Sequence, residues 1–271
     1  MYRAYKIEVN NDFKVILNQI AESGNRLEKI LIQKQCQAKE SMKSKLLKMI
    51  KNCSLTTQAL NADSIWDEWF PIVKADVFIS HSSKDAGLAR SFADWLKQKH
   101  QLTSFIDSEI WGHSDELLKD LDNEYCLNHG GETYSYEKRN GSTAHVHMML
   151  SYALTRMIDR AECFIFLESH NSVTAEESVN GTYSPWIFHE LATVDTIKIK
   201  KPKRIILKAI SQNYELFTES FTLQIRYPIL GKRLREIDSS VLSTWTACSQ
   251  KSQEHSLDLL YQGTQNQEGG Q

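Results

Sequence analysis

Short apolar runs alternate with amphipathic stretches between residues 71 and 210. Each run is rich in β-branched or aromatic side chains and is bounded by polar residues, which predicts buried β-strands. Apolar residues spaced by three and four follow the first run, at Leu88, Phe92, Trp95 and Leu96, and recur from Val146 to Ile158, which predicts helices. This alternation predicts an α/β fold with a parallel sheet and helices on both faces. The predicted strands are Asp76–Ser80, Thr103–Asp107, Cys163–Leu167 and Arg204–Leu207.

The first 70 residues differ from the rest in having no proline and one glycine. Spacings such as Phe13, Ile16 and Ile20 predict helices, so we expect a helical N-terminal extension. The excess of Lys and Arg between residues 26 and 51 fits a helical arm that binds an acidic partner or a second copy, or simply a solvated helix face. We predict three parts: the extension at 1–70, an α/β domain with a C-terminal elaboration at 71–262, and a disordered tail at 263–271.

Composition narrows the classes of function. The net charge of -2 argues against a dedicated nucleic-acid-binding protein, which usually carries a strongly basic domain. The five cysteines form no C-x-x-C pair, so neither a disulfide framework nor a cysteine zinc site is indicated. No uncharged apolar run is long enough to span a bilayer, and the first residues do not resemble a signal peptide. We therefore expect a cytoplasmic protein that binds neither membranes nor nucleic acids.

Polar side chains follow the predicted strands, and in a parallel sheet the carboxyl ends of the strands meet at one edge, where ligands bind. Ser80, His81 and Ser82 end the first strand, and Asp107 and Trp111 follow the second. Ser82 fits either a contact to a ligand or the cap of the next helix. His81 fits either proton transfer or a lining position. Two polar segments, 127–143 and 169–183, are predicted to be long loops.

The segment from Ser184 to Leu191 predicts the start of a helix, with Ser184 as N-cap and Pro185 in the first turn. Trp186 and Glu190 are four residues apart and therefore share a face. Glu190 fits a catalytic carboxylate, or one that only complements the helix dipole. Trp186 fits a ligand contact or a core residue.

Sites for metals and bound cofactors are not indicated. The two histidines at 145 and 147 diverge on a helix, where a zinc pair would be four residues apart. The chain has no G-x-G-x-x-G or Walker motif, so a nucleotide would be a substrate and not a resident cofactor.

Three motifs together resemble the Toll/interleukin-1 receptor (TIR) family. The stretch Asp76–Asp85 resembles the first strand and helix start, Phe105–Gly112 resembles the second strand and its loop, and Ser184-x-Trp186-x-x-x-Glu190-Leu191 resembles the third-helix motif. The resemblance covers roughly residues 74–209 and is greatest to bacterial TIR proteins of antiphage defence, of the Thoeris type. The long segment at 127–143 and Pro185 depart from the family pattern without removing a motif residue.

This resemblance implies a flavodoxin-like sheet and cleavage of NAD+ at its nicotinamide–ribose bond, with Glu190 as the catalytic residue. It also implies self-association through TIR–TIR contacts and an ADP-ribose-derived product that a separate effector protein senses. The substrate-binding residues that it implies are Ser80, His81, Ser82, Asp107, Trp111, Ser184 and Trp186.

One carboxylate is chemically sufficient for this reaction, because nicotinamide leaves as a neutral pyridine and needs no proton. Most glycosidases need a second carboxyl group as an acid for the leaving oxygen. Two other functions fit the sequence. One is a non-catalytic TIR scaffold that acts by assembly, and the other is a nucleoside-processing enzyme such as a deoxyribosyltransferase.

Overall fold

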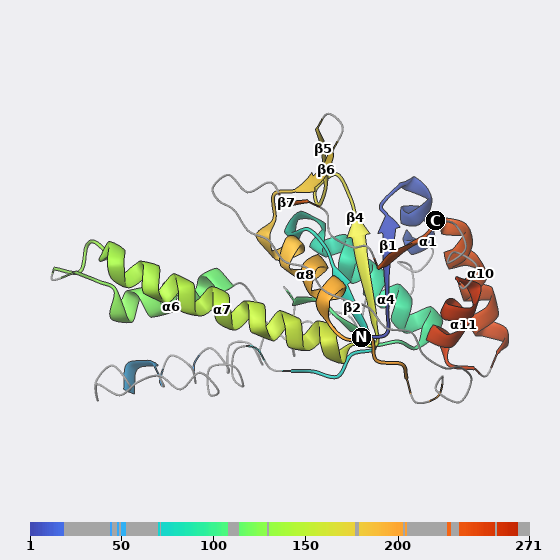
Figure 1. The fold of residues 1–271 in the computed structure, drawn as a ribbon, viewed down its shortest axis with the longest axis horizontal. Helices are drawn as coiled ribbons and strands as arrows, with labels where there is room; N and C mark the ends of the chain where they lie inside the picture. The colour runs from blue at the N-terminus through green and yellow to red at the C-terminus, as the bar shows by residue number, and fades with distance from the viewer. Residues whose placement is uncertain are drawn as a thin grey trace. The chain divides into compact units, whose positions relative to one another are not determined.

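The computed structural model is an α/β fold with a parallel β-sheet (Figure 1). The sheet takes strands from both the N-terminal and the C-terminal parts of the chain. The residues that the structure describes are 1–18, 72–107, 114–128, 130–176, 179–202, 233–252 and 254–264, together with 44, 48, 50–52, 70, 204 and 227–228.

Five strands in this part of the chain form one sheet in the order β3-β2-β4-β1-β8, and every pair is parallel. This confirms the predicted parallel sheet. Three of the four predicted strands are present, as β2, β3 and β4, whereas residues 205–207 of the fourth lie outside the described residues. The strands are β1 (Arg3–Glu8), β2 (Val77–Ser80), β3 (Ser104–Phe105), β4 (Cys163–Glu168) and β8 (Leu234–Ile237).

The prediction that residues 1–70 form a helical extension is wrong for residues 3–8, because these residues form β1, a strand of the main sheet. This strand lies between β4 and β8, with Tyr5 beside Ile165 on one side and beside Arg235 on the other. Tyr5 and Ile7 are buried and alternate with the more polar Lys6 and Glu8, which is the period of a strand. The helical pattern that starts at Phe13 is present, in α1 (Asn11–Asn18). Residues 19–43 lie outside the described residues.

Helices cover both faces of the sheet, as predicted. On one face lie α1, α4 (Ala86–His100), α10 (Ser239–Lys251) and α11 (Ser256–Gly263), which enclose a core that includes Ile79, Phe92 and Trp245. On the other face the ring of Phe78 packs against those of Phe105 and Phe164, with centroids 5.3 and 5.5 Å away, and α8 (Pro185–Thr196) crosses the strands (Figure 1).

Two segments predicted as loops contain regular structure. The 169–183 segment holds β5 (Thr174–Glu176) and β6 (Val179–Thr182), which form a small antiparallel sheet with β7 (Tyr227–Pro228). The 127–143 segment is a loop only as far as residue 135, because α7 (Tyr136–Arg160) begins there. Gly141 lies inside this helix, and no atom lies near the place of a Cβ there, so packing does not require a glycine at this position.

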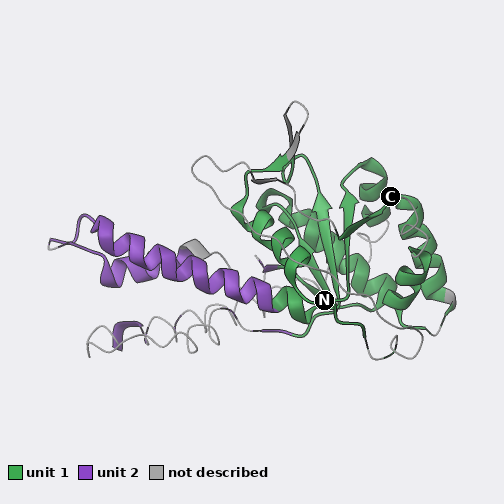
Figure 2. Ribbon diagram, in the orientation of Figure 1, with its two compact units in different colours: residues 1–23, 74–106, 157–271 green, residues 24–73, 107–156 purple. Residues whose placement is uncertain are grey.

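The chain divides into two compact units (Figure 2), and this division differs from the predicted domains. Unit 1 comprises residues 1–23, 74–106 and 157–271, and unit 2 comprises residues 24–73 and 107–156. Unit 1 therefore contains the sheet and takes its N-terminal strand from the segment that we predicted to be an extension.

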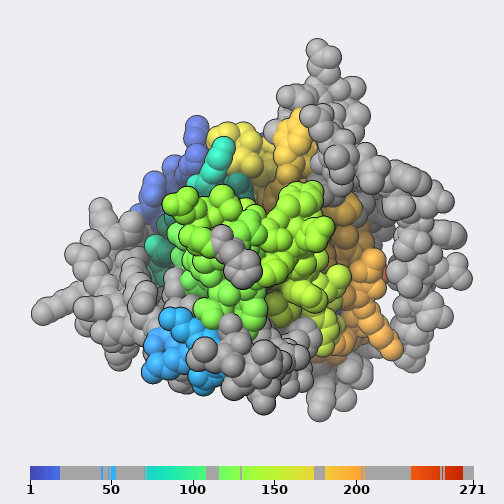
Figure 3. Space-filling view, turned by 90° about the vertical axis from the view of Figure 1, so that its left-hand side faces the viewer, coloured from blue at the N-terminus to red at the C-terminus, as the bar shows by residue number. Residues whose placement is uncertain are grey.

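Within unit 2, α6 (Ser114–Tyr125) and residues 136–156 of α7 form a helical hairpin. The buried carboxylate of Asp122 on α6 accepts hydrogen bonds from Arg139 Nε at 2.8 Å and from Ser142 Oγ at 2.5 Å, both on α7. Figure 3 shows the side chains of these two helices as one continuous surface.

The predicted tail at 263–271 is partly wrong. Gly263 ends α11, and Thr264 is completely buried, with its hydroxyl 3.0 Å from that of Tyr5 in β1. Residues 265–271 lie outside the described residues. Among the described helices, none combines the length and the apolar character needed to cross a membrane.

His100 at the end of α4 joins that helix to α10 and α11. Its ring stacks on Trp245 with centroids 3.7 Å apart, and its Nδ1 lies 3.0 Å from Ser249 Oγ and 2.8 Å from Ser256 Oγ. Burial, reinforced by the positive charge of Lys99, lowers the pKa of His100 to about 3. The folded protein therefore holds this ring neutral.

We predict that this buried histidine makes the fold sensitive to acid. The unfolded chain binds a proton at His100 below about pH 6.5, whereas the folded chain does so only near pH 3, so stability falls as the pH is lowered through this window. The contribution of His100 has a limiting slope of about 1.4 kcal/mol per pH unit. Urea unfolding of the wild type and of His100→Phe between pH 7 and 4 measures it. Equal pH dependence in the two proteins would contradict the prediction.

Candidate functional site

The strand order places a topological switch point between β2 and β4. After β2 the chain passes to β3 at one edge of the sheet, and after β4 it passes through α8 to β8 at the other edge. The two crossovers diverge, and in α/β proteins ligands bind at the carboxyl ends of the strands at such a point. Ser80, His81 and Ser82 lie at this end of β2, and all three are buried.

The local sequence sets where α8 begins. Ser184 is its N-cap, in an extended conformation, and its hydroxyl oxygen accepts a hydrogen bond from Ile187 N at 3.3 Å. Pro185 occupies the first turn, where its missing N–H costs nothing. The predicted helix start is confirmed, and the observed role of the Ser184 hydroxyl is to cap this helix.

Glu190 lies on the buried side of α8, in line with Ile187, Leu191 and Val194. Ser80 Oγ donates a hydrogen bond to Glu190 Oε2 over 2.5 Å. The two residues are only 1% and 4% exposed, so this is a hydrogen bond in the protein interior. A carboxylate that only complemented the helix dipole would lie in the first turn and in solvent, whereas Glu190 lies in the second turn and is buried.

Burial of a carboxylate is unfavourable unless hydrogen bonds or opposite charges compensate for the lost water. Ser80 provides one such hydrogen bond, and a hydroxyl that donates to an ionised carboxylate makes a stronger bond than one to a neutral acceptor. The chain thus keeps an acidic group at the switch point at a cost in stability, which is typical of functional sites.

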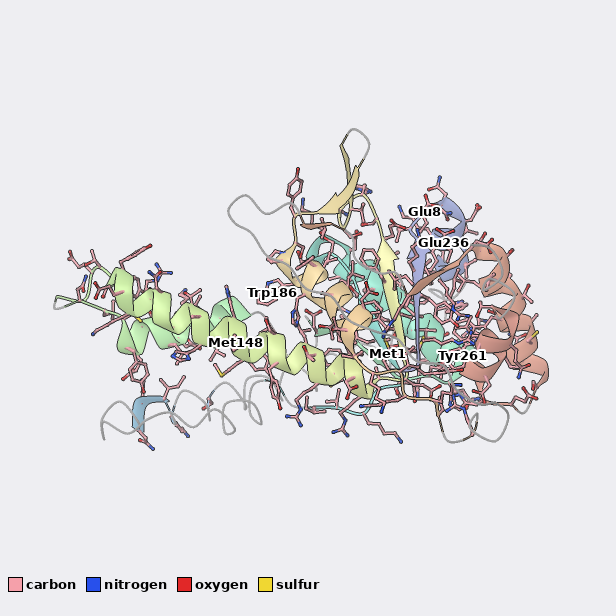
Figure 4. All side chains as sticks on the ribbon, viewed as in Figure 1. Met1, Glu8, Met148, Trp186, Glu236 and Tyr261 are labelled. Carbon is pink, nitrogen blue, oxygen red and sulfur yellow. The ribbon has the colours of Figure 1, made fainter. Side chains whose placement is uncertain are left out.

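Trp186 lies one helical turn before Glu190, at the start of α8 in Figure 4. Its side chain is half-buried and so is not a fully enclosed core residue. An indole that keeps part of its surface exposed next to a buried carboxylate can stack on a base or shield a cation.

Ser82 does not cap the helix that follows. It precedes the 3-10 helix η1 (Ser83–Asp85), but its side chain makes no capping hydrogen bond, and only its carbonyl oxygen accepts one, from Asp85 N at 2.8 Å. His81 is 9% exposed, with Nδ1 3.4 Å from the carbonyl oxygen of Ile79. Both side chains therefore lie buried at the switch point without serving a helix cap.

Sequence reasoning missed a polar network that joins the loops after β2 and β4. The Asp85 carboxylate accepts hydrogen bonds from Ser169 Oγ at 2.5 Å and from Asn171 Nδ2 at 2.8 Å. Ser169 Oγ also accepts the N–H of Asn171 and of Ser172, which closes a tight turn after β4. The sequence shows only that Asp85 and Ser169 each follow a predicted strand, and their pairing depends on the strand order.

For two of the predicted residues, Asp107 and Trp111, the structure does not test a place at this site. Asp107 is half-buried after β3 and belongs to unit 2, whereas Ser80 and Glu190 belong to unit 1. Trp111 lies outside the described residues. In the part of the chain that the structure describes, no three side chains of the His, Cys, Asp or Glu type are grouped so that they could hold a metal ion.

Comparison of the chain with models of protein families, with curated proteins and with solved structures finds no match. The function is therefore argued from the site itself.

We predict that Ser80 and Glu190 are energetically coupled. Ser80→Ala leaves a buried carboxylate without this donor and should lower the free energy of unfolding by about 1–3 kcal/mol. The loss should be much smaller in a Glu190→Met background, where no carboxylate remains to be satisfied. A double-mutant cycle by urea unfolding measures the coupling. Additive effects of the two substitutions would show that the hydrogen bond carries no net energy.

Proposed function

We propose that this protein is a TIR-type NAD+ glycohydrolase that breaks the bond between nicotinamide and ribose. The observation that carries the proposal is the buried carboxylate of Glu190 at the switch point of the sheet, hydrogen-bonded by Ser80. The resemblance of the Ser80 and Trp186–Glu190 motifs to the TIR family supports the same reaction.

In this proposal Glu190 supplies the negative charge that the reaction needs. Nicotinamide leaves with the bonding electron pair and becomes neutral, while positive charge develops at C1′ of the ribose. A fixed carboxylate in a site that excludes water stabilises this charge far better than one in solvent. Ser80 holds one carboxylate oxygen and so fixes its orientation. In this proposal Glu190 faces the ribose, and Trp186 stacks against the nicotinamide ring.

The wider function follows from the same resemblance. NAD+ is the substrate, and no resident cofactor is required. The product is an ADP-ribose derivative, formed by hydrolysis, cyclisation or transfer, which signals to a separate effector in antiphage defence in the cytoplasm. Self-association through TIR–TIR contacts is part of the proposal. Besides Ser80 and Trp186, the proposed contacts to the substrate are Ser82, Asp107, Trp111 and Ser184.

We predict that the full-length protein releases nicotinamide from NAD+ and that Glu190→Gln lowers this rate by about 10²–10³-fold. Glutamine keeps the shape and an acceptor for Ser80 but removes the charge. Chromatography with mass spectrometry identifies the products, at high protein concentration to favour assembly.

Glu132→Gln is the matched control, because Glu132 is exposed in the α6–α7 loop. Thermal melting shows whether each variant is folded. Equal nicotinamide release by the wild type and a folded Glu190→Gln would contradict the proposal. Wild-type protein that assembles without turnover would instead favour the scaffold, and turnover of nucleosides but not NAD+ would favour a deoxyribosyltransferase.

A further inference from the structure

His81 carries a buried nitrogen whose hydrogen-bonding capacity is unused in the described part of the chain. A carbonyl oxygen only accepts hydrogen bonds, so the contact from Nδ1 to Ile79 O places the proton on Nδ1 when the ring is neutral. Nε2 then bears the lone pair. This atom is fully buried and has no hydrogen-bond partner among the described residues.

A second buried histidine, His100, has a structural role and serves as a comparison for His81. His100 also has an unpartnered Nε2, but its Nδ1 contacts two serine hydroxyls and its ring is packed between Trp95 and Trp245. Packing explains why that ring is retained. For His81 the described residues offer one long hydrogen bond, to Ile79, and no aromatic stacking partner. An unsatisfied acceptor of this kind calls for an explanation, and a ligand donor is one.

The position of His81 connects it to the proposed reaction. It follows Ser80 directly, and Ser80 holds the carboxylate of Glu190. We propose that Nε2 of His81 is the general base that takes the proton from the hydroxyl group attacking C1′. This inference rests on the proposed function and assigns a second catalytic residue to it.

The step balances without any further reactant. The C1′–N bond breaks and its electron pair stays on the nicotinamide nitrogen. The oxygen of water, or of an acceptor hydroxyl, forms the new bond to C1′, and its proton passes to Nε2, which makes the imidazole cationic. The proton then leaves to solvent. Glu190 stabilises the cationic ribose and takes up no proton in this step.

Exchange of the pyridine base separates this role from a structural one. A pyridine nitrogen attacks C1′ with its lone pair and has no proton to lose, so isotopically labelled nicotinamide can enter NAD+ without a general base. His81→Phe should therefore lose hydrolysis by about 10²-fold or more, the usual effect of a general base, while it keeps base exchange near the wild-type rate. Glu190→Gln should lose both reactions. His145→Phe, at an exposed position on α7, is the control.

Each outcome decides the inference. If His81→Phe loses hydrolysis and exchange equally, or keeps both, His81 is not the base although the proposed function stands. If the wild type performs neither reaction, or Glu190→Gln keeps both, the proposed function itself fails and this assignment fails with it. Nitrogen-15 NMR of the resting protein adds a test without turnover: a protonated Nε2 at His81 would overturn the inference, and an unprotonated one is expected.

Discussion

The hydrogen bond between Ser80 and Glu190 is the contact on which the site depends. It joins the last residue of β2 to the second turn of α8, two elements separated by more than a hundred residues of sequence. Because both side chains are buried, the carboxylate can exist here only with its partners in place. The sheet and α8 must therefore assemble correctly before the site exists, and the fold and the chemistry are linked through one pair of side chains.

The loops around this pair are held by a second set of contacts. Asp85, in the turn after β2, is hydrogen-bonded to Ser169 and Asn171 after β4. The loops on the two sides of the switch point are therefore fixed to each other. A site that stabilises a developing positive charge gains from such rigidity, because polar groups that are already oriented need not reorganise during the reaction. The helix cap at Ser184 likewise fixes the start of α8, the helix that carries Glu190.

Much of this arrangement could be predicted from local sequence, where a pattern reports on its own neighbourhood. The apolar runs before Ser80 and after Cys163 gave the strands, and Ser184–Pro185 gave the helix start. The N-terminal strand was missed because the helical spacing that begins at Phe13 dominates that region, and a six-residue strand has a weak pattern. The contacts of Asp85 were missed for another reason, since a hydrogen bond across 84 residues depends on strand order, which no local pattern encodes.

The interior position of β1 in the sheet has a consequence for how the protein folds during synthesis. This strand is synthesised before both of its neighbours, β4 and β8, which come from residues 163–168 and 234–237. Until those segments leave the ribosome, both edges of β1 are unpaired. The side chains of Tyr5 and Ile7, which are buried in the folded protein, are then exposed to solvent. Open strand edges of this kind promote aggregation. The nascent chain must therefore protect β1 until residues 163–168 and 234–237 have been synthesised, and only then can both edges of the strand pair.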